Sequence, residues 1–180
     1  MGKLKYVEGN LIIKALYKDF DGVTHGCNCQ NVMGAGIALD FRSVFQANRL
    51  PLESETRKGD YSKMGNIDFG FFNTKTLTIT PLNLLRDNLF LDVSSGLYVI
   101  NSYTRFHYST GKYVNPKSNI ALDYEAVAMC FDKINHTFKG MHLGIPQIGA
   151  GLAGGSWDRI SAIIEDVTPN IDVTCVIYKQ

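Results

Sequence analysis

Two glycine clusters could bind an anion, because each stands between a strand-like run and a helix-like pattern. Gly34-Ala35-Gly36 follows the run 22–29, and the cluster Gly149 to Gly155 follows the run 141–145. At such a junction the first N–H groups of a helix lack partners, and the helix dipole is positive there. Glycine also lets a ligand approach the backbone closely. The pattern favours phosphate binding, and two such loops in one small chain suit a diphosphate.

Glycine-rich loops also occur in two other kinds of nucleotide site and in plain turns. Gly149 to Gly154 matches G-x-G-x-x-G, which is typical of dinucleotide-binding proteins. Only one helix and one strand are expected after this loop, however, and Asp172 precedes that strand instead of ending it. Neither loop ends in the Gly-Lys-Ser/Thr of a P-loop. A plain turn or helix boundary stays open as the alternative for each loop taken alone.

Side chains that could move a proton or orient water lie just before the first glycine cluster. His25 can donate or accept a proton near pH 7, and Asn28 offers two donors and an acceptor. The structural alternative for His25 is a hydrogen-bonded histidine in the core. The structural alternative for Asn28 is a residue that caps a turn. Cys27 and Cys29 share one side of an alternating strand, and nothing adjacent guarantees a lowered thiol pKa. We therefore expect both cysteines to pack rather than react.

Other candidates are weaker. Arg105 follows a strand-like run and could contact a phosphate. Trp157 is expected to pack beneath the second glycine cluster rather than stack on a ligand. The remaining histidines show no ligand spacing with one another or with the cysteines, so we predict no metal site; they are His107, His136 and His142.

The elements that must position these residues alternate between strands and helices. Strands are predicted at Lys5–Val7, Gly22–Cys29, Ile67–Asn73, Leu77–Thr80, Leu97–Tyr103, Met141–Ile145 and Val173–Tyr178. Helices are predicted at Ala35–Phe45, Ile120–Phe138 and Trp157–Val167, with Ser156 as an N-cap of the last. This alternation predicts an α/β layered fold. The stretch from Leu50 to Gly65 is interpreted as a short helix and loop.

Composition limits the classes of function. With 180 residues, 45% apolar content and no linker, the chain is expected to form one domain over residues 1–180. The 18 basic and 17 acidic residues nearly cancel, which argues against nucleic-acid and membrane partners. The 4 cysteines lack the spacing of a zinc site or of a disulfide scaffold. We expect reduced thiols, a cytoplasmic location and a monomer.

Three segments together resemble the macrodomain family. They are Tyr6-Val7-Glu8-Gly9-Asn10-Leu11, then His25 to Cys29 with Met33 to Ala38, then Ile145 to Leu152 with Trp157. The match is nearest to the yeast-type branch that processes ADP-ribose 1″-phosphate. The resemblance implies a single three-layer α/β/α fold with a mixed central sheet and an ADP-ribose cleft along the strand ends. The middle, from about Phe45 to Leu97, does not contribute to it.

The resemblance also implies roles for residues. His25 would face the terminal ribose as the leading catalytic candidate, with Asn28 orienting the ribose or the attacking water. Asn10 stands where most macrodomains place an adenine-binding Asp, and its amide oxygen could accept from the adenine amine. The residues implied to bind the ligand are Gly9, Asn10, Leu11, Gly26, Cys27, Asn28, Met33, Gly34, Ala35, Gly36, Ile37, Ala38, Gln147, Ile148, Gly149, Ala150, Gly151 and Leu152.

Departures from the family leave three activities open. Ala153 stands where a branch that removes ADP-ribose from glutamate carries an Asp, and the Asn-Ala-Ala-Asn form of the mono-ADP-ribosyl hydrolases is absent. The first expectation is a metal-independent phosphatase, without a cofactor, acting on ADP-ribose 1″-phosphate. The alternatives are an ADP-ribosyl hydrolase and a binding module without chemistry.

Overall fold

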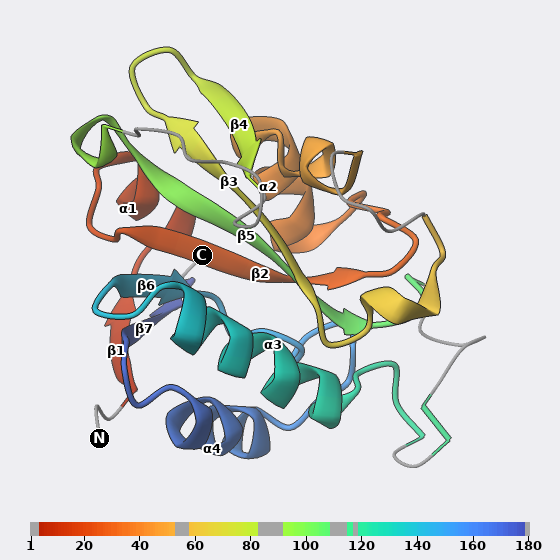
Figure 1. The fold of residues 1–180 in the computed structure, drawn as a ribbon. Coiled ribbons are helices and arrows are strands. Elements are labelled where there is room, and N and C mark those ends of the chain that lie inside the picture. The colour runs from red at the N-terminus through yellow and green to blue at the C-terminus, as the bar shows by residue number, and fades with distance from the viewer. Residues whose placement is uncertain (1–3, 53–57, 83–91, 109–114, 117–118, 179–180) are drawn as a thin grey trace.

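A mixed seven-stranded sheet organises the protein (Figure 1). The computed structural model describes residues 4–52, 58–82, 92–108, 115–116 and 119–178. The strands are β1 (Lys5–Glu8), β2 (Gly22–Asn28), β3 (Ile67–Asn73), β4 (Thr78–Leu82), β5 (Gly96–Arg105), β6 (His142–Ile145) and β7 (Asp172–Ile177). Their order across the sheet is β1-β7-β6-β2-β5-β3-β4. The strands β1, β7, β6, β2 and β5 run parallel, whereas β3 pairs antiparallel with both β5 and β4.

Helices cover both faces of the sheet. The helices α1 (Leu11–Leu16) and α2 (Gly36–Phe45) pack on one face, where Phe41 and Phe45 enter a buried cluster with strand residues. The helices α3 (Tyr124–Thr137) and α4 (Trp157–Val167) pack on the other face, through residues such as Phe131 and Ile160. The predicted three-layer α/β/α fold with a mixed sheet is therefore confirmed. Within the described ranges no helix has the length and apolar character needed to span a membrane.

The ends of several elements differ from the predictions for local reasons. The helix α3 begins at Tyr124 instead of Ile120, because the Asp123 side chain accepts from the Ala126 N–H and caps the helix there. The helix α1 was not predicted, because its six residues are too few to show an apolar period. The stretch 50–65 contains parts of two 3₁₀ helices, Ala47–Leu52 and Tyr61–Lys63, and residues 53–57 of it lie outside the described ranges.

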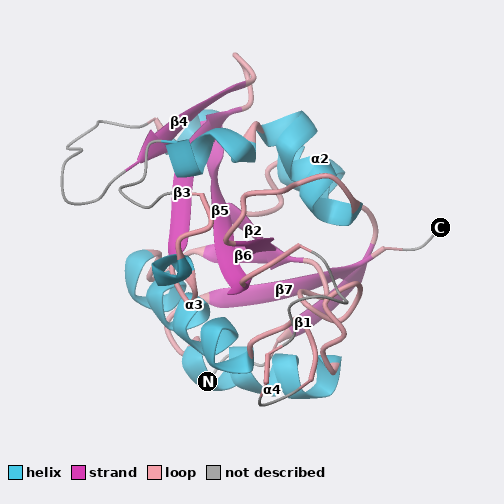
Figure 2. Cartoon of the chain, turned by 90° about the vertical axis from the view of Figure 1, so that its right-hand side faces the viewer, coloured by secondary structure: helices cyan, strands magenta, loops and turns pink. Residues whose placement is uncertain are grey.

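The parallel strands place one set of loops together. The carboxyl ends of β1, β2, β5, β6 and β7 share one edge of the sheet, because these strands run in the same direction. Figure 2 looks onto the side where β2 and β5 end, with α2 above the strands and α4 below them. After β2 the chain passes to α2 on one face of the sheet, and after the neighbouring strand β6 it passes to α4 on the other face. Such a divergence opens a crevice at the carboxyl edge of an α/β sheet.

Candidate functional site

Two adjoining cavities occupy this crevice. The larger has a volume of about 620 Å³ and the smaller about 240 Å³. Both are lined by Gly36 and Ile37 after β2 and by Pro146 and Gln147 after β6. Because they share these four wall residues, the cavities form one continuous cleft. It runs from the ends of β1 and β7, through the starts of both glycine loops, to the end of β5.

The second glycine loop offers backbone donors to the smaller cavity. Gly149, Gly151, Leu152 and Ala153 line it, and their N–H groups donate no hydrogen bond to any residue that the structure describes. The loop is held in shape from within, since the Gly155 N–H donates to Gly149 O at 2.8 Å. The turn thus has several N–H groups without a partner among the described residues, an arrangement suited to an anion.

The first glycine loop offers the start of a long helix. Ala35 is the N-cap residue of α2 and supplies no side-chain hydrogen bond, and the first turn contains no acidic side chain. The first N–H groups of α2 are therefore left without a capping acceptor. Gly36, which both cavities share, has φ +57°, a left-handed conformation that glycine adopts readily. The positive end of the α2 dipole faces the middle of the cleft.

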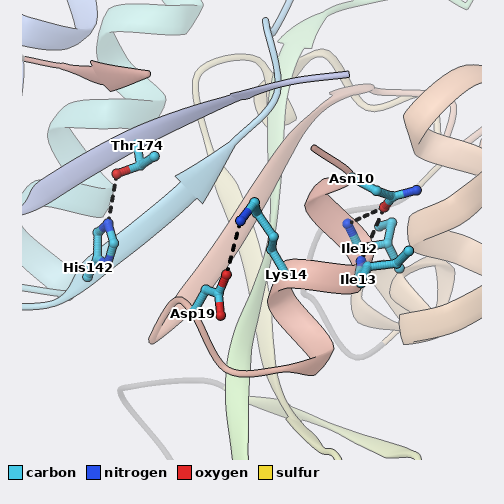
Figure 3. A network of polar contacts seen from close by, with 7 residues as sticks. All are labelled: Asn10, Ile12, Ile13, Lys14, Asp19, His142 and Thr174. Atoms are coloured by element: carbon cyan, nitrogen blue, oxygen red, sulfur yellow. Dashed lines mark hydrogen bonds and ion pairs between the residues drawn. The ribbon is translucent and has the colours of Figure 1, made fainter. Parts of the chain in front are cut away.

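Asn10 joins α1 to the larger cavity (Figure 3). Its Oδ1 accepts from the Ile12 N–H at 2.9 Å and from the Ile13 N–H at 3.2 Å, so the side chain caps α1. In Figure 3 the amide nitrogen points away from these two bonds. The group that Asn10 leaves for a ligand is thus the NH₂ donor, whereas the sequence analysis assigned this role to the oxygen.

Replacing Asn10 by Ala is expected to lower the free energy of unfolding by about 1 kcal/mol, because α1 loses its side-chain cap. Asn10→Asp retains an oxygen acceptor for the same two N–H groups and should leave stability within roughly 0.5 kcal/mol of the wild type. Urea unfolding of the two variants measures the difference. Equal losses in both variants would show that the cap bonds do not contribute.

His25 lies inside the protein rather than on the cleft wall. Its side chain is 0% exposed, its ring packs 4.2 Å from the Phe41 ring, and it lines neither cavity. Asn101 Oδ1 accepts from His25 Nε2 at 2.9 Å, while Asn101 Nδ2 donates to Ala47 O. Burial lowers the pKa of His25 to about 4, so the imidazole is neutral at pH 7. This geometry supports a positioning role better than proton transfer to a ligand.

Asn28 is engaged at both ends of its amide. Nδ2 donates to Val32 O at 2.8 Å, and Oδ1 accepts from the Val32 N–H at 3.1 Å. The side chain is nearly buried and closes the turn that leads from β2 toward α2. Of the two roles considered for Asn28, orienting a ligand and capping a turn, these contacts match the turn cap.

The cysteines are free and buried. Burial raises the pKa of Cys29 to about 12, and it raises the pKa of Cys27 as well. Thiols with raised pKa values are poor nucleophiles at neutral pH, which agrees with the expected packing role. In the described part of the chain no group of three His, Cys, Asp or Glu side chains could hold a metal ion.

Many of the sequence-predicted site residues come together in the cleft. Those that line one cavity or both are Asn10, Leu11, Gly26, Ala35, Gly36, Ile37, Ala38, Gln147, Ile148, Gly149, Gly151 and Leu152. Those that line neither are Gly9, His25, Cys27, Asn28, Met33, Gly34 and Ala150. Trp157 packs edge-on against Tyr6, with ring centroids 6.5 Å apart.

Several lining residues were not in the predicted site. The larger cavity also contains Ile12, Ile13, Asp40, Val44, Val176 and Tyr178, and the smaller contains Thr104 and Ala153. Arg105, a weaker candidate for phosphate contact in the sequence, lines the smaller cavity too. Thr104 and Arg105 end β5, and Tyr178 directly follows β7. The usable signal was their position after predicted parallel strands, where ligands bind in open α/β sheets.

Comparison with known protein sequences shows a relative that matches almost the whole chain. No protein-family model matches the chain. It is 25% identical, over 98% of its length and 97% of the relative, to an uncharacterised 17.5 kDa protein from the tk-vs intergenic region of Enterobacteria phage T4.

Solved structures resemble the whole chain. A protein of unknown function from Bacteroides thetaiotaomicron superposes with a TM-score of 0.64 at 21% identity, covering 98% of each chain. The DarG macrodomain of Thermus aquaticus gives 0.60 at 19% identity over 100% of each chain. Thermosipho africanus DarTG, solved in complex with ADP-ribose, gives 0.65 at 15% identity, over 98% of this chain and 42% of that one. The chain therefore has the macrodomain fold.

Proposed function

We propose that the cleft binds ADP-ribose or a close derivative. The continuous cavity with unused backbone donors from both glycine loops is the observation that supports this proposal. The larger cavity, walled by apolar side chains such as Leu11 and Val176, suits the base. The diphosphate lies at the shared wall, beside the start of α2, and the distal ribose enters the smaller cavity. Thermosipho africanus DarTG, which matches this fold over 42% of its length, was solved in complex with ADP-ribose and supports this choice of ligand.

The reaction that we propose is release of phosphate from ADP-ribose 1″-phosphate. Water attacks phosphorus and gives up a proton, the bond between phosphorus and the ribose oxygen breaks, and the leaving ribose oxygen takes up that proton, so that the products are phosphate and ADP-ribose. In this proposal His25 and Asn28 act by holding the end of β2, from which Gly26 enters the smaller cavity. The backbone donors of the second loop neutralise the developing charge.

A binding module without turnover is the second candidate. It is favoured by one observation, that the imidazole of His25 is buried and both amide ends of Asn28 are occupied. Cleavage of ADP-ribose from a protein is supported less well, because Ala153 presents only a methyl group to the smaller cavity.

Calorimetry with ADP-ribose, AMP and ribose 5-phosphate tests the proposal. We expect a micromolar Kd for ADP-ribose, about −8 kcal/mol, and weaker binding of each half. Phosphate release from ADP-ribose 1″-phosphate then separates the phosphatase from the binding module. A wild-type protein that binds none of these compounds at millimolar concentration would contradict the whole proposal.

A further inference from the structure

Arg105 is a charged residue on the cleft wall for which the proposed function has not yet accounted. It ends β5 and lines the smaller cavity, next to Thr104. The loop residues Ile148 and Leu152 line the same cavity. Arg105 therefore belongs to the wall of the smaller cavity and not to that of the larger one.

The guanidinium is incompletely satisfied. Its Nη1 atom is buried and has no hydrogen-bond partner, and no carboxylate among the described residues pairs with Arg105. Burial lowers its pKa, but an arginine stays protonated at neutral pH. The titratable group that interacts with it is the Cys27 thiol, which burial keeps neutral. A half-buried guanidinium with one buried, unpaired nitrogen carries a desolvation cost, and an anion held beside it would offset part of that cost.

We infer that Arg105 receives a phosphate group attached to the distal ribose, so that the cleft selects phosphorylated over unphosphorylated ADP-ribose. A guanidinium donates two parallel hydrogen bonds to phosphate oxygens, a geometry that a ribose hydroxyl cannot accept in the same way. This inference rests on the proposed function, since it assumes that the distal ribose occupies the smaller cavity. Arg105 is in this respect a specificity-determining residue.

Paired affinities test the inference. The wild type should bind ADP-ribose 1″-phosphate about 10-fold or more tightly than ADP-ribose, because a hydrogen-bonded charge pair is added. Arg105→Ala should weaken the phosphorylated ligand by roughly 10- to 100-fold and ADP-ribose by less than about 3-fold. Arg105→Lys, which retains the charge without the planar fork, should give an intermediate loss. If phosphate is released during the titration, kcat/KM for the phosphorylated compound replaces its Kd.

Arg42→Ala is the matched control. Arg42 is an exposed residue of α2 and lines neither cavity, so both affinities should equal those of the wild type. Thermal unfolding of each variant checks that the fold is retained, and Arg105→Lys serves if Arg105→Ala does not fold. Equal losses for both ligands would place Arg105 at the shared diphosphate, and no loss would make it a packing residue. Either result overturns the inference, whereas a wild type that does not bind ADP-ribose overturns the proposed function itself.

Discussion

Gly149→Ala is expected to lower the free energy of unfolding by about 2 to 4 kcal/mol and to abolish ADP-ribose binding. Gly149 has φ +74°, where an L-residue is strained, and an added Cβ would lie 2.6 Å from Leu122 Cδ1. Leu122 is fully buried in the core beneath the loop, so it cannot move aside without creating strain elsewhere. The loop would shift and its free N–H groups would lose their alignment.

Gly151→Ala separates the loss of ADP-ribose binding from the loss of stability. Gly151 has no positive φ, and an added Cβ there would meet no heavy atom within 4 Å. Its stability should remain within roughly 0.5 kcal/mol of the wild type. Because Gly151 lines the smaller cavity, its binding of ADP-ribose should still weaken as the methyl group fills the approach of the ligand. Urea unfolding and calorimetry of both variants make the comparison, and similar stability for the two would contradict the predicted role of Leu122.

Acidification is expected to destabilise the protein through His25. The folded pKa of His25 is about 4 because of burial, against 6.5 for an exposed histidine. Between pH 6.5 and pH 4, His25 is therefore protonated in the unfolded chain but stays neutral in the folded chain. The contribution of neutral His25 to the free energy of unfolding is fully present above pH 6.5 and is lost as the pH falls to 4. The total loss is roughly 3 kcal/mol, because each unit of pKa difference corresponds to about 1.36 kcal/mol.

Urea unfolding between pH 7 and pH 4 measures this loss. His25→Asn removes the ionisable ring, and its stability should fall less steeply with pH than that of the wild type. The variant will be less stable at pH 7, so the slopes are compared rather than the absolute values.

Another buried group acts in the opposite direction. Burial raises the pKa of Asp68, so its carboxyl group favours the folded state as the pH falls. Subtracting the free energy of unfolding of His25→Asn from that of the wild type at each pH removes the contribution of Asp68, because Asp68 is present in both proteins. Identical slopes would show that His25 ionises in the folded protein near its ordinary pKa.

Local patterns in the sequence determined the secondary structure and the nature of the two loops. The buried strand β5 begins with the apolar run Leu97 to Ile100, a local signal that does not depend on its neighbours in the sheet. Both glycine clusters lie at strand-to-helix junctions, as predicted, because glycine and the change from strand to helix are themselves local signals. The short helix α1 was missed, since its six residues are too few to show a period.

The order of the strands decided what the site contains. Asn10 and Tyr178 line the same cavity as Gly36 because β1, β7, β6 and β2 are neighbours in the sheet, and no local pattern specifies that order. Arg105 lines the smaller cavity because β5 pairs beside β2. Burial likewise turned His25 inward against Phe41, an outcome set by α2 packing across the strand. The sequence by itself determined that two glycine-rich loops join strands to helices, whereas tertiary packing decided which side chains face the space between them, because burial and proximity depend on residues far apart in the chain.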